Sequence, residues 1–313
     1  MALFQAPILT DGATHSAQQF RMLVRDLARG NEGITEGDDL KVTALSTPGS
    51  SVNIADGSGI VRGRDNAFQG SYAVCNVGTE TIDIAPTGGS PRSDMVVLRV
   101  EDPEYPGSSL DPATDQIEYF QIISGVTSTA TAIPDARTAI PLARIDIPAS
   151  TSIITNAMIT DLRSIANARR DRQLLLQSPT LLSTEISGSS GTFSYFDTLG
   201  GWNIAIPVWA ARVKIKIDVG QIRYSTGQIF GYLRGTFGAS LTVQQVILDD
   251  NQGTGIRRAT VVLGDNLLIP SAYRGTTQLL RLQVAGISGN TGKYSVDAST
   301  TVIADVEFFE APY

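Results

Sequence analysis

Short apolar or alternating runs, separated by Gly, Pro, Asn and Asp, fill most of the chain and constrain its fold more than any other feature. Runs of this length between turn-forming residues are typical of β-strands. Residues 213–219 alternate between apolar and charged side chains, which predicts one buried and one solvated face. Residues 95–100 are apolar on both faces, which predicts a central strand. We therefore expect a mainly β protein.

Strands are expected at residues 41–45, 52–54, 60–62, 72–76, 81–84, 95–100, 116–123 and 142–147, and in the C-terminal part at 193–196, 213–219, 228–233, 241–248, 259–263, 279–284, 293–296 and 301–309.

The length and a change in pattern predict two domains, because 313 residues suffice for two cores at roughly 100–200 residues each. Residues 1–155 combine short strands with one helical segment and form the expected N-terminal β-rich domain. Residues 185–313 contain eight expected strands with no helix signal between them, which predicts a jelly-roll-like β-sandwich as the C-terminal head domain. The boundary is expected in the Ser- and Thr-rich residues 178–190.

The first helical segment covers residues 16–29 and is predicted to be one amphipathic helix. Ser16 and Gln19 have the spacing of a capping box, and Gly30 stands where a glycine ends a helix. One apolar face follows from the spacing i, i+3, i+4, i+7 and would be available for docking. Its residues are Phe20, Leu23, Val24 and Leu27.

A second helix is predicted at residues 156–177, ended by Pro179. Its apolar stripe consists of Met158, Leu162 and Ile165. Two interpretations stay open. The stripe either docks on the first domain or packs against copies of itself as the stalk of a trimer.

Composition excludes several chemistries. One cysteine and one histidine cannot form an intramolecular disulfide or supply the ligands of a zinc site, so no metal or other cofactor is expected. Cys75 is expected to be a small buried strand residue. Glycine-rich phosphate-binding motifs are missing, which leaves nucleotide use unsupported.

The net charge of −7 belongs to the N-terminal half. Residues 1–172 hold 14 Lys and Arg against 21 Asp and Glu, whereas residues 173–313 hold 10 of each. Neither half suits nucleic acid as a partner. The four lysines and the lack of a long apolar run argue against membrane insertion, and the first residues do not resemble a signal peptide, so synthesis in the cytoplasm is expected.

Carboxylates offer two weaker sites. Acidic residues crowd the segment 101–118, which is either a solvated loop or a Ca²⁺ site without the usual loop spacing. In the C-terminal domain, carboxylates flanking a glycosidic bond would make a depolymerase. The candidates for that role are Asp197, Asp218, Asp249 and Asp265.

Aromatic residues of the C-terminal domain mostly fall in expected strands, where core packing explains them. Trp202, Tyr273 and Tyr294 are instead flanked by turn residues. Together with the neighbouring Arg274 and Lys293 they are expected to be exposed and to stack on a sugar or grip a protein surface. These five residues are the predicted receptor contacts.

The order of segments in the first half carries a resemblance. Residues 33–43, 52–63, 69–74, 91–102, 140–145 and 159–163 follow the helix that ends at Gly30. This succession, over about residues 1–165, resembles the N-terminal domain of minor tail proteins of long-tailed bacteriophages, especially those that infect actinobacteria. The resemblance implies that the N-terminal domain attaches to the tail tip or baseplate and that the C-terminal part faces the host.

Pattern and resemblance together predict a non-enzymatic structural protein of the virion. It would join other tail and baseplate proteins, form a homotrimer, and present its C-terminal sandwich to a glycan or protein of the host surface. Two alternatives stay open, a purely structural brace of the baseplate and a glycan depolymerase, with capsid decoration as a third.

Overall fold

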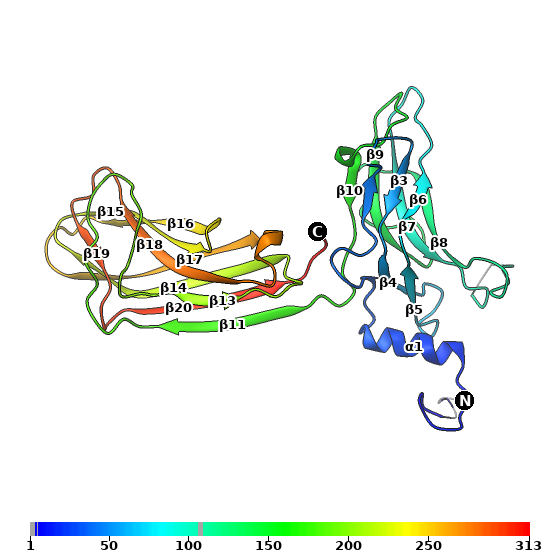
Figure 1. The fold of residues 1–313 in the computed structure, drawn as a ribbon, viewed down its shortest axis with the longest axis horizontal. Helices are drawn as coiled ribbons and strands as arrows, with labels where there is room; N and C mark the ends of the chain where they lie inside the picture. Colours follow the sequence, from blue (N-terminus) through cyan, green and yellow to red (C-terminus); the bar gives the residue numbers. More distant parts are fainter. Residues whose placement is uncertain (1–3, 5, 106–108) are drawn as a thin grey trace. The chain divides into compact units, whose positions relative to one another are not determined.

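The computed structural model describes residues 4, 6–105 and 109–313, which divide into two compact units (Figure 1). Unit 1 comprises residues 1–168 with 312–313, and unit 2 comprises residues 169–311. The division falls at residue 169, before the expected boundary at 178–190. The prediction of a mainly β chain is confirmed.

Unit 1 contains one α-helix, ten strands and a short 3-10 helix within its described residues. Their bounds are α1 (Ala17–Leu27), β1 (Gly33–Ile34), β2 (Val42–Ala44), β3 (Ser51–Ile54), β4 (Gly57–Arg62), β5 (Ser71–Asn76), β6 (Glu80–Asp83), β7 (Arg92–Val100), β8 (Glu118–Val126), β9 (Ala139–Ile147), η1 (Asn156–Met158) and β10 (Ile159–Asp161). The strands form three antiparallel sheets with the orders β1-β4-β5, β2-β3-β6 and β10-β9-β7-β8.

The main core of unit 1 draws on all three sheets. Strand β7 lies between β9 and β8, and its apolar residues are buried on both faces, as predicted for residues 95–100. Val96 and Leu98 join the main core, while Met95 and Val97 belong to a smaller cluster on the opposite face. Two layers of side chains therefore fix this sheet in the middle of the unit.

The predicted second helix at residues 156–177 is wrong. Only Asn156–Met158 turns, as a 3-10 helix, and β10 follows it directly. Strand β11 (Arg170–Gln177) belongs to unit 2 and pairs with β20 (Thr301–Phe309) along its whole length. Alternate residues of β11 are exposed, which is the period of a strand and not of a helix.

The three residues of the predicted stripe still pack within unit 1. Met158 and Ile165 contact the main core, and Leu162 contacts the smaller cluster. Because these partly buried side chains are covered by their own unit, they do not form a free stripe for self-association. The docking interpretation therefore agrees with their contacts, although Met158 ends the short 3-10 helix η1, and Leu162 and Ile165 lie in the loop after β10 instead of on an α-helix.

Unit 2 is a sandwich of two antiparallel sheets. Besides β11 and β20 it contains β12 (Ser194–Tyr195), β13 (Trp202–Ala205), β14 (Arg212–Ser225), β15 (Ile229–Phe237), β16 (Leu241–Asp250), β17 (Arg257–Leu268), η2 (Ser271–Tyr273), β18 (Thr277–Gly286) and β19 (Lys293–Ser295). One sheet has the order β11-β20-β14-β17, with β19 beside β14, and the other has the order β12-β18-β15-β16, with β13 beside β18. Apart from the short side strands β13 and β19, the two orders of four strands are those of a jelly roll, so the predicted fold is confirmed.

The core of unit 2 lies between these two sheets. The alternation along β14 explains this core. Val213, Ile215 and Ile217 are fully buried, whereas Lys214 and Lys216 between them point outward. Arg170 and Phe309 pair at one end of the sheet, so the chain enters and leaves the unit at the same end. We call this the connecting end, and the end of β14 at Ser225 the far end.

Candidate attachment surface

Helix α1 begins with the capping box predicted from the sequence. The backbone N–H of Gln19 donates to the Ser16 hydroxyl at 3.2 Å, and the Ser16 N–H donates to Gln19 Oε1 at 2.9 Å. This reciprocal capping box satisfies N–H groups that the first turn leaves without partners. Beyond the last turn, Gly30 has a positive φ of 74°, as expected for a helix-ending glycine.

Part of the apolar face of α1 is exposed. Gln19 and Arg21 are the buried residues of the helix, whereas Phe20 and Leu27 are 47% and 70% exposed. Leu23 and Val24, the other two predicted residues, are half-buried. Unit 1 thus holds the helix by polar side chains and leaves two of the four stripe residues, Phe20 and Leu27, exposed, an arrangement that sequence periodicity alone could not reveal.

Arg21 is the residue that anchors α1. Its Nε donates to the Gln69 carbonyl at 2.9 Å, and its guanidinium pairs with Asp102 at 3.2 Å and with Glu104. The rings of Tyr72 and Tyr105 lie 5.6 and 5.3 Å from the guanidinium carbon. The side chain is only 10% exposed, so these contacts operate in a partly desolvated site where charge pairing is strong.

Tyr72 links this anchor to the sheet. Its hydroxyl donates to Asp102 at 2.7 Å and accepts from Gln69 at 3.0 Å. Burial, followed by the hydrogen bond to Asp102, raises the pKa of the phenol. The hydroxyl therefore stays protonated and keeps its role as a donor.

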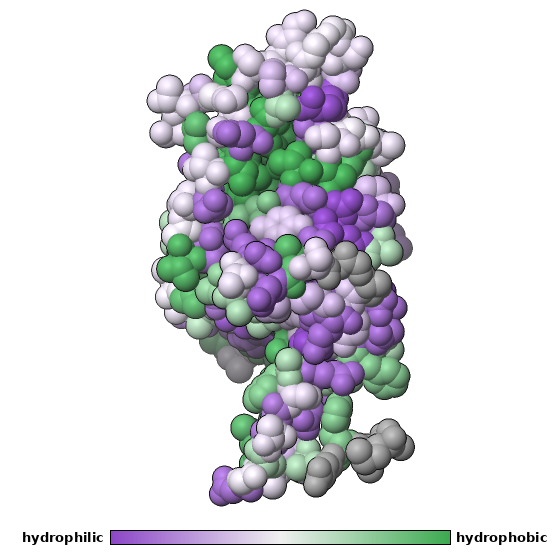
Figure 2. Space-filling view, turned by 90° about the vertical axis from the view of Figure 1, so that its right-hand side faces the viewer, coloured by the Kyte–Doolittle hydropathy of each residue, from purple (hydrophilic) through white to green (hydrophobic). Residues whose placement is uncertain are grey.

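The N-terminal residues cover a different side of α1. Gln19 Nε2 donates to the Ala6 carbonyl at 2.9 Å. A groove of about 490 Å³ lies here, lined by Phe4, Ala6, Pro7, Ile8, Gln19, Met22, Leu23 and Asp26. Phe4, Leu9 and Phe68 are also more than half exposed. Figure 2 shows green, hydrophobic side chains among the polar ones at this end of unit 1.

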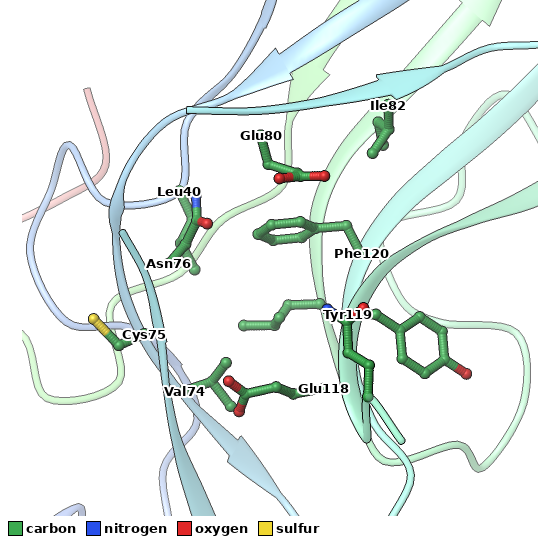
Figure 3. Close-up of a pocket in the computed structure, with 11 residues that line it drawn as sticks. Leu40, Val74, Cys75, Asn76, Glu80, Ile82, Glu118, Tyr119 and Phe120 are labelled. Atoms are coloured by element: carbon green, nitrogen blue, oxygen red, sulfur yellow. The ribbon is translucent and has the colours of Figure 1, made fainter. Parts of the chain in front are cut away.

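A second, smaller cavity of about 260 Å³ lies where β5, β6 and β8 border their sheets (Figure 3). Phe120 points into it between the carboxylates of Glu80 and Glu118, and Ile82 also lines it. Burial raises the pKa of Glu118. Cys75 also borders the cavity, but it is exposed, which corrects the expectation of a buried strand residue.

The acidic segment 101–118 uses most of its carboxylates within the fold. Asp102 faces Arg21 and Tyr72, Glu101 accepts from Tyr119, and Asp111 and Asp115 bond to backbone N–H groups of their own loop. Over residues 4, 6–105 and 109–313, no group of three or more His, Cys, Asp or Glu side chains could hold a metal ion. Residues 106–108 of this segment lie outside the described residues.

The predicted receptor contacts of unit 2 do not form one site. Tyr273 and Arg274 follow Ile269, whose backbone N–H donates to the Ala211 carbonyl at the connecting end. Lys293 instead pairs with Ser225 at the far end. Trp202 lies in β13, partly buried against the core, and its ring N–H donates to the Leu176 carbonyl at 3.4 Å. The Tyr273 hydroxyl accepts from the Ser240 N–H at 2.8 Å.

Tyr294 is not a surface residue, which corrects the prediction. It is fully buried, its hydroxyl donates to Asn290 at 2.9 Å, and its ring meets that of Tyr224 edge to face at 6.0 Å. The glycine and lysine before it suggest a turn, but pairing between β19 and β14 places Tyr294 opposite Tyr224. Burial raises the pKa of both phenols.

A polar network at the far end was not predicted. Glu185 accepts from Ser225, from Arg223 at 2.8 Å and from Lys293 at 3.1 Å. The hydrogen bond from Ser225, and after it those from Arg223 and Lys293, lower the pKa of Glu185 to about 2. Lys293 therefore helps to hold the segment before β12 against β14 and β19.

The four carboxylates considered for a depolymerase are separated. Asp218 and Asp265 lie on β14 and β17, but Asp218 is on the outward face with Lys216 while Asp265 pairs opposite the inward Ile215. Asp197 accepts from Thr184, and Asp249 lies near the end of β16. These positions give no facing pair of carboxylates among the four.

No protein-family model and no curated protein matches the sequence. Among solved structures, the chain is similar to infectious bursal disease virus of the Gx strain, with 12% identity, a TM-score of 0.26, and coverage of 92% of this chain and 82% of the other. The VP2 subviral particle of that virus is similar at 12% identity and a TM-score of 0.25, with coverage of 89% of this chain and 74% of the other.

A further similar structure is a protein in complex with neoagarooctaose, at 9% identity and a TM-score of 0.22, covering 82% of this chain and 32% of the other. TM-scores of this size do not show a shared fold over the whole chain. The jelly roll of unit 2 accordingly rests on its own strand order. In the described residues, no helix has both the length and the apolar character needed to cross a membrane.

Proposed function

We propose that the protein is a structural component of a virion, specifically a minor tail protein of a long-tailed bacteriophage. Unit 1 attaches to the tail tip or baseplate through the open stripe of α1, and unit 2 is presented to the host surface. The exposed stripe is the observation that carries the proposal. An apolar helix face left uncovered in a β-rich unit is costly in water unless a partner covers it.

Two features support this assignment. The buried Arg21 network fixes α1 against the unit, so the stripe is held in one orientation and loses little entropy on binding. The succession of segments over residues 1–165 resembles that of tail proteins in which the N-terminal domain attaches to the tail and the C-terminal part faces the host. The function proposed is binding and assembly, without catalysis or a cofactor.

The stripe is tested by replacing Phe20 and Leu27 together with serine. Tagged wild-type and variant chains are produced in cells in which the virus assembles, and their incorporation into purified particles is compared. We expect at least a tenfold loss of incorporation, since burial of the exposed parts of both side chains, about 2–4 kcal/mol, would be lost. Folding should be unaffected because both side chains are exposed.

Asp26→Ser is the matched control, since Asp26 is exposed on the same helix but lies outside the stripe. Its incorporation should equal that of the wild type. Equal incorporation of the Phe20 and Leu27 variant would contradict attachment through α1.

A trimer in which unit 2 repeats three times would raise the avidity of weak host contacts. Light scattering of the purified chain at micromolar concentration tests this part of the proposal. A mass of one chain, 33.3 kDa, would contradict the trimer without affecting attachment through α1.

The alternative function is a brace that supports the baseplate and makes no host contact. The dispersal of Tyr273, Arg274 and Lys293 over two ends of unit 2 favours it over a receptor site built from those residues. A virion reconstruction separates the two, because a brace has the far end of unit 2 buried against neighbours.

A further inference from the structure

The outer face of the β12-β18-β15-β16 sheet carries an ordered group of aromatic and arginine side chains. Pairing sets Tyr195 opposite Gln283, and Gln283 opposite Arg234. In the next row Arg281 lies opposite Thr236. Phe193 directly precedes β12 and joins this group through its ring, over which the guanidinium of Arg234 lies. We call Phe193, Tyr195, Arg234, Arg281 and Gln283 the outer-face platform.

Each arginine of the platform lies over an aromatic ring. The guanidinium carbon of Arg234 is 3.7 Å from the centre of the Phe193 ring, and that of Arg281 is 4.1 Å from the centre of the Tyr195 ring. Arg234 Nε also donates to Gln283 Oε1 at 3.0 Å, and the Tyr195 hydroxyl lies 3.3 Å from that of Thr236. These contacts hold the planar groups in fixed positions.

The positive charge of the platform is not neutralised by the fold. None of the ion pairs among the described residues involves Arg234 or Arg281. Arg281 Nε is buried and has no hydrogen-bond partner. Along β15 the first acidic partner in the register is Asp249, opposite Phe230, four residues from Arg234. Among the described residues, no hydrogen bond or ion pair uses the terminal nitrogens of Arg234 or Arg281, so these keep donors available for an anion.

The platform also retains apolar contact surface. Tyr195 is 40% exposed, and Ile247, in the adjoining row opposite Tyr232, is 63% exposed. A flat face of this kind with hydroxyl and amide groups between the rings suits the C–H surface and hydroxyls of a sugar ring. Nucleic acid fits less well, because it is bound through many phosphate contacts and this half of the chain holds equal numbers of acidic and basic residues.

We propose that the outer-face platform binds an anionic glycan. A sugar ring packs beside Tyr195 and Phe193, and its carboxylate or ester oxygens accept hydrogen bonds from Arg281 and Arg234. This inference rests on the proposed host-facing role of unit 2 and gives that role a substrate class and a set of residues.

Binding is measured by titration calorimetry with the purified full chain at fixed ionic strength. The probes are polygalacturonate, which carries carboxylates, dextran sulfate, which carries sulfate esters, and unmodified dextran. We expect both polyanions to bind and dextran to bind at least tenfold more weakly. The stronger of the two polyanions identifies the kind of anionic group.

Arg281→Gln and Arg234→Gln should each weaken polyanion binding about tenfold, which corresponds to one well-made charged contact. Lys214→Gln is the matched control, since it removes one positive charge from the outward face of the other sheet. It should leave the affinity unchanged. Thermal unfolding checks that the variants fold, and Arg281→Lys, which keeps the charge but loses the planar fork, should bind with intermediate affinity.

If Lys214→Gln weakened polyanion binding as much as the arginine variants, the binding would come from diffuse electrostatic attraction, and the proposed site at the platform would be overturned. Wild-type affinity in both arginine variants would overturn it as well, and so would equal binding of dextran. Because this measurement needs no virion, its failure leaves attachment through α1 untouched, and loss of attachment leaves glycan binding measurable.

Discussion

Arg21 shows how a single residue decides which face of a helix is available. In the sequence it is one charged residue of an amphipathic helix, and such residues usually face solvent. In the fold it is buried between Asp102, Glu104 and two tyrosine rings, contributed by segments about 50 and 80 residues away. These partners are not visible from periodicity, which explains why the stripe was predictable and its exposure was not.

Removing this anchor should destabilise unit 1. Arg21→Ala leaves the nearly buried Asp102 without its cation, and breaking such a pair costs about 3–5 kcal/mol. Urea unfolding at neutral pH measures the free energy of unfolding. Arg25→Ala, a half-buried arginine on the same helix, is the control and should stay within about 0.5 kcal/mol of the wild type. Equal losses of stability in the two variants would contradict the role of Arg21 as the anchor of α1.

Glu185 makes a pH-dependent contribution to unit 2. Its pKa in the folded chain is lowered from 4.5 to about 2, so the unfolded state binds the proton more readily. The stabilisation is therefore fully present above pH 4.5 and is lost as the pH falls toward 2. Thermal unfolding followed across this range should show a falling midpoint.

Glu185→Gln should flatten this part of the pH profile and lower the stability near pH 7 by about 1–3 kcal/mol, because charged hydrogen bonds to Arg223 and Lys293 are lost. Asp249→Asn, in the same unit but outside the network, is the matched control and should match the stability of the wild type near pH 7. A profile for Glu185→Gln that parallels the wild type would refute the assignment.

At the scale of elements, local signals were sufficient where the structure is local. The capping box of α1 and the alternation of β14 involve neighbouring residues, and both appear as expected. Strand β11 is the contrary case. Its Leu, Arg and Gln residues are good helix formers, yet pairing with β20 across more than 120 residues decides its conformation. Tyr294 and the outer-face platform depend on strand register in the same way.

The whole molecule consists of two units with separate cores, and this has a consequence for unit 2. Its core is closed on one side by β11, whose Leu175 packs inward and whose backbone pairs with eight residues of β20. A fragment of residues 169–311 contains every strand of both sheets. We expect it to unfold cooperatively and to keep the circular dichroism of a β protein.

The fragment 185–313, which follows the boundary expected from the sequence, is the matched comparison. It lacks β11, so one edge of β20 loses its partner and the core beside Leu175 opens to water. We expect this fragment to unfold at lower denaturant concentration and to aggregate through the freed strand edge. Equal stability of the two fragments would mean that β11 is dispensable and that the jelly roll is complete without it.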